Sequence, residues 1–555
     1  MAKLIPMNLR TGLLLLLLVK GTFGHAQGPD WQWAQAFGSA GVDQARGICA
    51  DGSGNFFVTG YFTGSSISIG GTTLVNTQTN NSADLFLAKV ASDGTFLWVQ
   101  QIGGTGSQVG ISVAATPLGQ VVLTGTYENS ITVGSTGLLS NGGSDVFVAK
   151  FTASGMPMWA TTMGGGSGDQ VSDVAVGDDG VVAVVGSFNS AVFAAGNTNL
   201  QNNDPGDEDL YMVTLDVFGG FQWAMSAGGT YDDVAQSVAI DASGHIVVGG
   251  YFACAALDLG GQTLTNANDN YNDLFLAKYD AAGDLIWAKR AGGTRHERIW
   301  GVGIHGNGDI VTTGSFIDAS LDLDGTVLTN TTTDQSWYDL FVARFDGDGT
   351  LIWARSGGGI YDEFVSDLSV DGDGNTVIVG EFDSPAPVFG GTTLTHVDDY
   401  DAFAVKYGPD GTALWARAAG GDDGDRAHAV ACGQNGEVGV AGYFNSDPFQ
   451  VGALSLGNNM DNDLWLGLLG SPTGLAEHLD ELGASVHPSI GTGEVMVTSM
   501  VPMQSIRVVD ASGRTVLHRS VNSTNASVVL AAPGAYSIRI TTSKGSAVLR
   551  ALVVR

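Results

Sequence analysis

Short apolar runs separated by glycine-rich polar turns follow one another along most of the chain. In residues 234–241 apolar and polar positions alternate, and residues 245–252 (HIVVGGYF) form a second run that ends in Gly-x-aromatic. Runs of this length, bounded by turn residues, predict β-strands. A polar segment then precedes a third run beginning at Asp273 and a fourth closing on Trp287. Four strands in each repeated unit are typical of a β-propeller blade.

Three landmark residues recur seven times, with steps of about 61 to 66 residues between the Asp members. Trp33 precedes the first Asp landmark, and no Trp landmark follows Asp463. A ring of sheets closes securely when its last sheet is completed from the other end of the chain. We therefore expect an all-β chain with a seven-bladed β-propeller closed by an N-terminal strand that carries Trp33. The Asp landmarks are Asp84, Asp145, Asp209, Asp273, Asp339, Asp401 and Asp463; the glycines are Gly60, Gly125, Gly186, Gly250, Gly314, Gly380 and Gly442; the tryptophans are Trp33, Trp98, Trp159, Trp223, Trp287, Trp353 and Trp415.

Each landmark has a structural role that we expect before any functional one. Gly250 and its equivalents permit a bulge or a close approach of strands, and the following aromatic residue fills the space between sheets. Trp287 and its equivalents are expected to pack against the next unit where Gly292 and Gly293 leave room. The Asp landmarks are expected to accept backbone N–H bonds in tight turns.

The two ends of the chain differ from its middle. Residues 1–26 contain Lys3 and Arg10, an apolar run at 13–19 and a small-residue ending at Ala26, which predicts a secretory signal peptide. The apolar run is too short to cross a bilayer, so no transmembrane segment is expected. We expect the propeller over residues 27–470, a linker over 471–480 and a second domain over 481–555.

Composition supports short strands and limits the classes of partner. The chain has 82 glycines, and 14% of its residues are charged, which suits tight turns better than long helices. Residues 27–473 contain 51 acidic and 13 basic residues, a balance that argues against nucleic acid and anionic membranes and allows cations or basic partners. The three cysteines have no metal-type spacing and are expected to be buried small apolar residues.

The repeated units resemble a known family. Residues 34–468 are similar to the bacterial β-propeller repeat family, whose motifs correspond here to Asp371-Gly-Asp-Gly-Asn375 with Gly380 and to Asp145-Val-Phe-Val-Ala-Lys150. The resemblance implies the propeller fold. It implies no activity, because that family shares no catalytic residue set.

From residue 474 bases replace acids and the long repeat stops. The segments at 486–493, 506–514 and 533–536, with a strand to the terminus, resemble the C-terminal sorting domain of the type IX secretion system, type A family. This chain has His487-Pro488-Ser489 where the family usually shows Pro-Asn-Pro. The resemblance implies a small β-sandwich that the outer-membrane translocon recognises and that is then removed. A small immunoglobulin-like sandwich used for adhesion is the alternative.

Six acidic residues fall at the start of the first strand of their units, with Gln108 at the seventh equivalent position. First strands line the channel of a propeller, so these carboxylates could gather at one mouth and raise each other's pKa unless a calcium ion compensates. In the alternative, which we favour, each carboxylate caps the glycine-rich turn of its own unit. The six residues are Asp43, Asp169, Asp233, Glu297, Glu363 and Asp425.

The segments before the third strands are rich in Asn and Asp and should lie on one face. Loops on one face of a rigid scaffold often bind ligands, and Tyr271, Trp337 and Tyr400 suit contacts with glycans. The alternative is that Asn and Asp are simply solvated turn residues. No Glu stands at the twelfth position after Asp371, so an EF-hand is excluded, and this run is expected to be a hairpin turn.

The sequence carries no recognisable catalytic set. The Asp, Gly and Trp spacings match neither a sialidase nor a quinoprotein propeller, and Arg298, His305 and His428 are scattered candidates in the channel strands. We therefore expect a secreted or cell-surface binding and adhesion module without enzymatic activity, with a glycan or a surface protein as ligand. The alternatives are a secreted polysaccharide hydrolase or lyase acting at the channel mouth, and a structural envelope component with a protein partner.

Overall fold

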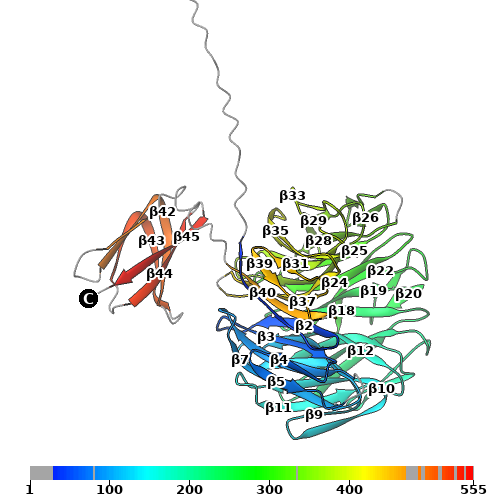
Figure 1. Cartoon of the computed structure of the whole chain (residues 1–555). Coiled ribbons are helices and arrows are strands. Elements are labelled where there is room, and N and C mark those ends of the chain that lie inside the picture. Colours follow the sequence, from blue (N-terminus) through cyan, green and yellow to red (C-terminus); the bar gives the residue numbers. More distant parts are fainter. Residues whose placement is uncertain are drawn as a thin grey trace, which may run out of the picture.

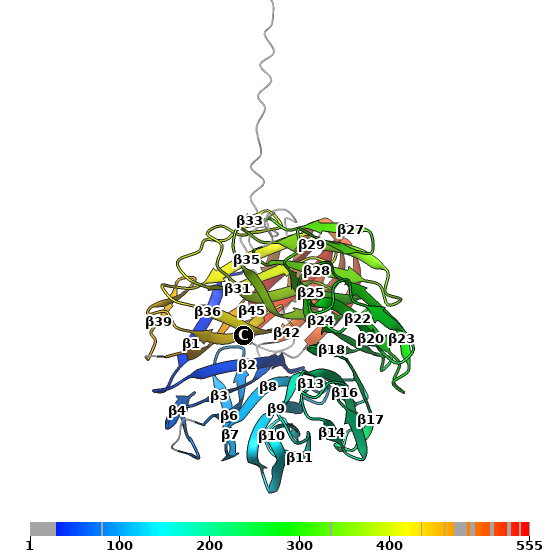
Figure 2. The same ribbon diagram turned by 90° about the vertical axis from the view of Figure 1, so that its right-hand side faces the viewer.

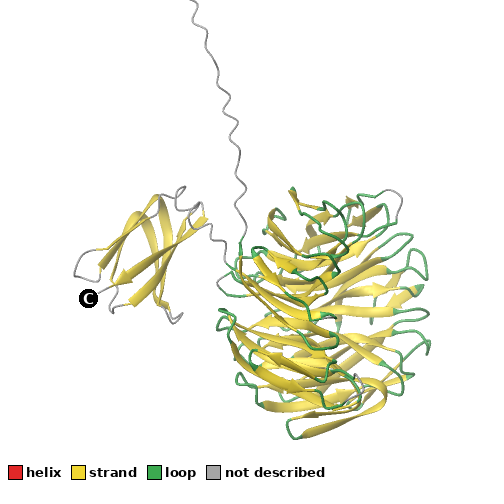
Figure 3. Cartoon of the chain, in the orientation of Figure 1, coloured by secondary structure: helices red, strands yellow, loops and turns green. Residues whose placement is uncertain are grey.

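The computed structural model describes residues 29–78, 82–332, 336–434, 436–459, 461–470, 485–488, 494–510, 515–529, 534–542 and 545–553. Within these ranges every regular element is a β-strand (Figure 3). The described residues contain no helix of the length and apolarity that crossing a membrane requires. The predicted signal peptide (1–26) and linker (471–480) lie outside them.

The segment around Asp273 forms a four-stranded antiparallel sheet. The hydrogen-bonded order is β18 (Asp233–Ile240), β19 (Ile246–Phe252), β22 (Asp273–Tyr279) and β23 (Leu285–Ala291). A hairpin of β20 (Ala256–Asp258) and β21 (Thr263–Thr265) lies between the second and third strands. Gly244 and Gly283 hold the two tight turns at φ of 81° and 89°, where a side chain is disfavoured. The four strands expected from the sequence pattern are confirmed here.

The same order of strands recurs along the chain, and we name each sheet by the Asp landmark that begins its third strand. Three sheets precede the Asp273 sheet: β2 (Asp43–Ala50), β3 (Asn55–Phe62), β6 (Asp84–Ala91) and β7 (Phe96–Thr105); β8 (Gln108–Ala115), β9 (Val121–Val133), β10 (Thr136–Phe151) and β11 (Pro157–Met163); and β12 (Asp169–Val176), β13 (Val182–Phe188), β16 (Asp209–Leu215) and β17 (Phe221–Ala227). Their hairpins are β4 (Ser66–Ile69) with β5 (Thr72–Val75), the extended ends of β9 and β10, and β14 (Val192–Ala195) with β15 (Thr198–Gln201). The end of β7 also pairs with β9, which joins the Asp84 and Asp145 sheets.

Two complete sheets follow: β24 (Glu297–Ile304), β25 (Ile310–Phe316), β28 (Asp339–Phe345) and β29 (Leu351–Gly357); and β30 (Glu363–Val370), β31 (Thr376–Phe382), β34 (Asp401–Tyr407) and β35 (Ala413–Ala419). Their hairpins are β26 (Ser320–Leu323) with β27 (Thr326–Thr329), and β32 (Val388–Phe389) with β33 (Thr392–Thr393). In the Asp463 sheet, β36 (Asp425–Cys432), β37 (Val438–Phe444) and β40 (Asp463–Leu469) pair in order, and the fourth strand is β1 (Trp31–Phe37). Its hairpin is β38 (Phe449–Val451) with β39 (Leu454–Leu456).

The sheets are arranged radially (Figures 1 and 2). In Figure 2 the first strands β2, β8, β18, β24 and β36 lie near the centre, and the fourth strands β7, β11, β17 and β23 lie at the periphery. Four-stranded antiparallel sheets repeated around a central axis form a β-propeller.

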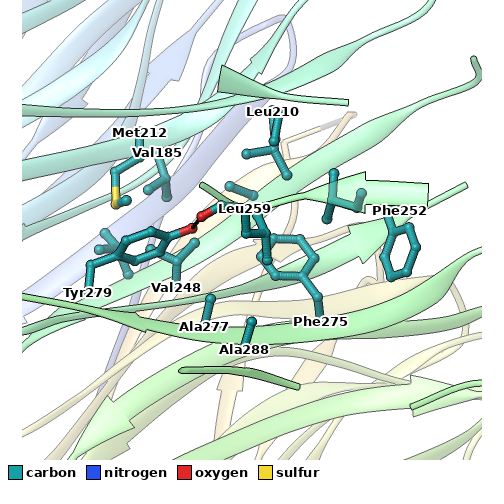
Figure 4. Packing of buried hydrophobic residues seen from close by; sticks show 14 of the residues in the cluster. Val185, Leu210, Met212, Val248, Phe252, Leu259, Phe275, Ala277, Tyr279 and Ala288 are labelled. Carbon is teal, nitrogen blue, oxygen red and sulfur yellow. Dashed lines mark hydrogen bonds between the residues drawn. The ribbon is translucent and has the colours of Figure 1, made fainter. Parts of the chain in front are cut away.

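The core lies between the faces of neighbouring sheets. Val185 and Met212 of the Asp209 sheet pack against Val248 and Phe275 of the Asp273 sheet, and the hydroxyl of Tyr279 donates a hydrogen bond to the carbonyl oxygen of Leu259 at 3.2 Å (Figure 4). Burying one such side chain stabilises the fold by about 1.5–3 kcal/mol. Because each sheet is apolar on both faces, a single unit cannot bury its own core, and repetition supplies the partner.

The glycine and aspartate landmarks have the structural roles expected of them. A Cβ on Gly250 would lie 2.0 Å from the carbonyl oxygen of Val234, and the register of β18 shifts between Ala235 and Ser237, which is a bulge. Every Asp landmark accepts a backbone N–H from the segment before it. The donors are Thr77, Asn141, Asn203, Ala267, Thr331, Val397 and Asn459, in chain order, at 2.8 or 2.9 Å.

The expected partner of the Trp landmarks is wrong. The Nε1–H of Trp287 donates to the carbonyl oxygen of Gly347, and a Cβ on Gly349 would lie 3.1 Å from its ring. Both glycines belong to the hairpin turn between the third and fourth strands of the next sheet. Gly292 and Gly293 instead face the carboxylates of Asp273 and Asp318. The turn glycine, at φ of 83°, has no side chain to keep the indole away.

The run at Asp371 is a hairpin turn, as the sequence predicts. Its carboxylate accepts N–H bonds from Asp373 and Asn375, both at 2.9 Å, and lies 2.7 Å from the ammonium of Lys406 on the third strand. Of the three free cysteines, Cys254 is buried as expected, whereas Cys49 and Cys432 are partly buried.

A separate sheet lies in the C-terminal region. It contains β41 (Ser485–Pro488), β42 (Glu494–Asp510), β43 (Thr515–Val529), β44 (Gly534–Thr542) and β45 (Gly545–Val553). Val497, Ile506 and Ile538 belong to its own apolar core. All five strands are connected by hydrogen bonds through β42, which pairs with β41 before its register shift at Thr498 and with β44 from Met503 onward, while β43 pairs with it on both sides of the shift. The small sandwich expected from the sequence stays a prediction.

Candidate functional site

The six carboxylates predicted as a channel-mouth ring are buried at the start of their first strands, and most cap the turn that precedes them. Asp169 accepts the N–H of Gly165 at 2.7 Å and the hydroxyl of Ser190 at 3.0 Å. Asp43, Asp233, Glu297 and Glu363 also accept the N–H of the residue four positions earlier, and Asp425 accepts the N–H and hydroxyl of Ser446. This geometry matches the capping alternative.

At all six positions burial outweighs these hydrogen bonds and raises the pKa of the carboxyl group. Burial raises the pKa of Asp43, Asp233 and Asp425 to about 7. Burial likewise raises the pKa of Glu297 and Glu363 to about 8. The carboxylates that add to these shifts lie outside the ring: Asp463 beside Asp43, Asp318 beside Glu297, Asp339 beside Glu363 and Asp401 beside Asp425. The mutual effect within the ring stays a prediction.

Among the described residues, no three His, Cys, Asp or Glu side chains lie close enough together to hold one metal ion. Gln108, the seventh equivalent, donates its amide N–H to the carbonyl oxygens of Thr105 and Gly106, at 3.2 and 3.0 Å. At this position the side chain therefore donates hydrogen bonds to backbone carbonyl oxygens, whereas the six carboxyl groups accept them from N–H or hydroxyl groups. The calcium hypothesis stays a prediction, without support from this geometry.

A belt of aromatic and charged side chains lies where the first strands begin. The carbonyl oxygens of Tyr338 and Tyr400, each just before an Asp landmark, accept the N–H of Glu363 and Asp425 on the next first strand. These bonds hold both tyrosines beside the channel mouth. Phe364, the second residue of β30, lies between them, with ring centroids 5.3 Å from Tyr338 and 6.4 Å from Tyr400.

Arg426 extends this belt to the next sheet. Its guanidinium carbon lies 5.6 Å from the ring centroid of Tyr400 and 5.8 Å from that of Tyr443. Its Nη1 is 3.1 Å from Oε1 of Glu381, a residue only 5% exposed, whose Oε2 has no hydrogen-bond partner among the described residues. Burial raises the pKa of Glu381 to about 7 although Arg426 opposes the shift. We call Tyr338, Phe364, Tyr400, Arg426 and Tyr443 the mouth belt.

Only one of the three predicted ligand-binding aromatics belongs to the mouth belt. Tyr400 is part of it, and its hydroxyl lies 3.5 Å from a carboxylate oxygen of Asp362. Tyr271 packs against His296 at 5.0 Å, and Trp337 packs against Tyr361 at 5.4 Å, each pair joining two sheets. The structure therefore distributes the three residues over separate contacts. Sequence reasoning missed Tyr338, Phe364 and Tyr443. Tyr338 precedes an Asp landmark and Phe364 follows a first-strand start, whereas Tyr443 follows the glycine landmark Gly442 in the second strand.

The channel below the mouth contains a cavity of about 310 Å³. Each first strand has a bulge, and the extra residue of each bulge lines this cavity. The seven bulge residues are Arg46, Ile111, Ser172, Gln236, Trp300, Ser366 and His428. Sequence reasoning singled out His428 but had no means of placing the bulges.

The other two channel candidates have different surroundings. Arg298 lies over the rings of Tyr251 and Trp300, at 4.7 and 5.8 Å, and donates from Nε and Nη2 to the side-chain oxygen of Asn272 at 2.7 and 2.9 Å. His305 is 3% exposed, and neither ring nitrogen has a partner among the described residues. Burial lowers the pKa of His305 to about 4, so the ring is neutral near pH 7.

Comparison with known proteins gives distant likenesses. No family model matches the chain. It is 22% identical over 377 residues, 57% of this chain and 27% of the relative, to an uncharacterized WD repeat-containing protein of Acanthamoeba polyphaga mimivirus. It is 25% identical over 319 residues, 54% of this chain and 33% of the relative, to the regulatory protein FlaEY of Caulobacter vibrioides. The chain thus spans a third or less of the length of these relatives.

Among solved structures, the WD40 domain of Neurospora crassa Pan2 is 9% identical, with a TM-score of 0.37 over 80% of this chain and 98% of that domain. The Sqt1 protein of Chaetomium thermophilum is 10% identical, with a TM-score of 0.36 over 75% and 97% of the two chains. The fold assignment rests on the sheets themselves. The chain is a β-propeller of repeated four-stranded units, similar in sequence to a WD repeat protein.

Proposed function

We propose that this protein is a secreted or cell-surface binding and adhesion module without catalytic activity, built on a seven-bladed propeller that its N-terminal strand closes. The pairing of β1 with β40 supports this closure, with Ala36 opposite Trp465 and the rings of Trp31 and Trp465 5.7 Å apart. First strands in contact with both neighbours, including β2 with β36 and with β8, support a complete ring.

The proposed route of export is the type IX secretion system. It rests on the sequence resemblance of residues 481–555 to a sorting domain, and the all-β sheet of β41–β45 is compatible with it. In this proposal a signal peptide at 1–26 directs the chain to the periplasm, and the outer-membrane translocon recognises the C-terminal domain. Fusing residues 471–555 to a reporter protein in a host with this system tests the route. Retention of the reporter in the periplasm would contradict it.

The mouth belt is the observation that carries the binding function. Three half-buried aromatic rings follow one another across the Asp339 and Asp401 sheets, and a guanidinium and carboxylates adjoin them. A rigid scaffold that holds partly exposed aromatic rings beside charged groups fits a ligand with both apolar faces and hydroxyl groups. We therefore propose a glycan as the ligand, with its ring faces on Tyr400 and Phe364 and its hydroxyls toward Asp362 and Arg426.

A glycan-array screen of the purified chain, run with calcium and with a chelator, tests this proposal. The Tyr400→Ala variant should lose at least about tenfold in affinity for any glycan bound, because it removes the aromatic surface and its contact with Arg426. The matched control is Phe218→Ala, since Phe218 is an aromatic residue 82% exposed in the turn between β16 and β17. This turn lies at the other end of the sheet.

The outcomes separate the alternatives. Binding that Tyr400→Ala abolishes and Phe218→Ala keeps supports the mouth belt as the glycan site. Binding that requires calcium would support the hypothesis that the buried carboxylates hold a calcium ion. Release of soluble saccharide from a polysaccharide would favour the hydrolase or lyase, and absence of binding to every glycan would direct the search to protein partners.

A further inference from the structure

The cavity in the central channel is polar, although it lies inside the propeller. Beside the bulge residues it is lined by Asp173 of β12 and Asp367 of β30, each the residue after a bulge. Its volume of about 310 Å³ is at the lower limit of small-ligand pockets. The cavity is separate from the mouth belt, because none of the belt residues lines it.

Asp173 and Asp367 occupy equivalent positions and have unequal hydrogen bonding. Asp173 accepts two backbone N–H bonds, from Val174 and Val238 at 2.8 and 3.0 Å. It also accepts the hydroxyls of Ser112 and Ser237, at 2.8 and 2.9 Å, from the sheets on either side. These four donors oppose the effect of burial, which still raises the pKa of Asp173.

Among the described residues, Asp367 has two donors, both backbone N–H groups: Leu368 at 2.7 Å and Val430 at 2.9 Å. The positions that correspond to Ser112 and Ser237 are Gly301 and Ala429, which have no hydroxyl. Asp367 thus lacks both side-chain donors in the same cavity. Burial raises the pKa of Asp367 to about 8, and the charge of Asp173 adds to the shift, so this carboxyl is largely protonated near pH 7 unless a cationic group binds beside it and favours the ionised form.

Two further groups in the cavity lack partners, and both lie on the next first strands around the channel. Nε2 of His428, on β36, and Nε of Arg46, on β2, are buried without a hydrogen-bond partner among the described residues. Burial and the nearby charges of Arg46 and Arg426 lower the pKa of His428 well below its usual range, so this ring is neutral. The cavity therefore has a carboxyl group short of hydrogen-bond donors on β30 and a guanidinium nitrogen without an acceptor among the described residues on β2.

We propose that the channel cavity binds a small zwitterion of the α-amino-acid class, with its ammonium group at Asp367 and its carboxylate at Arg46. The ammonium supplies the donors that Gly301 and Ala429 do not, and the carboxylate accepts from the guanidinium. His428 lies on the strand between them and contacts the ligand through Nε2. A bound metal ion fits less well, because the described residues place no three metal-binding side chains together.

Isothermal titration calorimetry of the full chain with free amino acids, starting with glycine and L-alanine, tests this proposal. Methylamine and acetate serve as the two halves of the ligand. Glycine should bind at least about tenfold more tightly than either half, since each half leaves one of the charged side chains unpaired. Asp367→Asn and Arg46→Gln should each weaken glycine binding by about tenfold or more, because each removes one charged partner.

Ala429→Ser provides a sharper test, because it keeps every charge. It places at Asp367 the hydroxyl that Ser237 offers to Asp173, so glycine affinity should fall by about threefold or more. Phe218→Ala, in a turn remote from the channel, is the control that should bind as the natural chain does, and circular dichroism verifies that each variant is folded.

Each of three results would overturn the proposal. Methylamine binding as tightly as glycine would make the site a simple cation site. Unchanged glycine affinity in folded Asp367→Asn would place the ligand elsewhere. No heat of binding with any amino acid at millimolar concentration would mean that the cavity holds water only.

Discussion

The Trp landmarks connect neighbouring sheets, and one of them lacks its connection. Trp353 donates its Nε1–H to the carbonyl oxygen of Pro409 in the next sheet at 2.9 Å. Trp415 is buried to a similar degree, 5% exposed against 7%, but its Nε1 has no partner among the described residues. Five other Trp landmarks make the same bond as Trp353, with Trp33, Trp98, Trp159, Trp223 and Trp287 donating to Ser92, Ala153, Val217, Ala281 and Gly347.

Trp415 is the exception because the sheet next to it, the Asp463 sheet, takes its fourth strand from the N-terminal end of the repeat region. In the Asp463 sheet the third and fourth strands are β40 and β1, which come from opposite ends of the repeat region. No hairpin turn joins these two strands, so none offers Trp415 the carbonyl that the other Trp landmarks use within the described part of the chain. Arg417, two residues further along β35, donates instead to the carbonyl oxygen of Pro29, which precedes β1.

We predict that Trp415→Phe destabilises the propeller less than Trp353→Phe does. Both changes remove similar buried ring area, so their packing costs are similar. Trp353→Phe also breaks a hydrogen bond worth about 1 kcal/mol, although the carbonyl of Pro409 keeps a second donor, Nη1 of Arg344 at 3.1 Å. Trp415→Phe instead removes a buried donor whose desolvation costs about 1 kcal/mol or more. The free energies of unfolding of the two variants should therefore differ by about 2 kcal/mol.

Guanidinium unfolding followed by far-UV circular dichroism measures this difference, because that signal comes mainly from the backbone of the strands rather than from single indole rings. The m-values should be equal in the two variants, so that the midpoints report stability. Trp98→Phe, in which a bond of 3.1 Å is lost, should resemble Trp353→Phe. Equal destabilisation by Trp415→Phe and Trp353→Phe would refute the reasoning, since it would mean that the connection contributes nothing or that Trp415 has a partner beyond residue 470.

Three further outcomes are expected. The buried carboxyls of Glu297 and Glu363 keep their protons up to a pKa of about 8, whereas the unfolded groups ionise near 4.5, so the folded state binds more protons between these values. The thermal midpoint, measured by differential scanning fluorimetry, should therefore fall as pH rises from 5 to 8. Glu297→Gln should make the midpoint less dependent on pH. A midpoint that rises with pH would contradict this reasoning. Gly380→Ala should cost at least about 3 kcal/mol in denaturant titrations, because its Cβ would lie 1.9 Å from the carbonyl oxygen of Phe364. Gly372→Ala, with open space around the new Cβ, should change the free energy of unfolding by less than about 0.5 kcal/mol. Iodoacetamide should modify no cysteine in the native chain and all three in denaturant. Burial raises the pKa of Cys432 to about 12 and raises the pKa values of Cys49 and Cys254 further, so the reactive thiolate is scarce in the folded state. Labelling of any cysteine in the native chain would be inconsistent with this burial.

The predicted ligand residues show where reasoning from sequence stopped. Tyr271, Trp337 and Tyr400 have similar neighbours in the sequence, two or one residues before an Asp landmark, but only Tyr400 joins the mouth belt. A difference of one residue places the side chain on another side of the strand start. The partner on the next sheet then decides whether the ring contacts Arg426 or a single aromatic neighbour.

Local sequence alone determined the four strands of each unit, the turns and the roles of the Asp landmarks. These features depend on side-chain alternation, on positive φ at turn glycines and on hydrogen bonds within a few residues. All three can be inferred from residues that are close together in the sequence. Gly250, for example, has to be a glycine because the carbonyl of Val234 occupies the place of a Cβ.

Only the tertiary structure decided which side chains meet across sheets. The bulges select one residue of each first strand for the channel, the position of Trp287 depends on a turn about 60 residues later, and the hydrogen bonding of Asp367 depends on Gly301 and Ala429 in two other sheets. Such contacts join residues about one repeat apart. Their chemistry is therefore set by the register and order of the sheets, which no local pattern specifies.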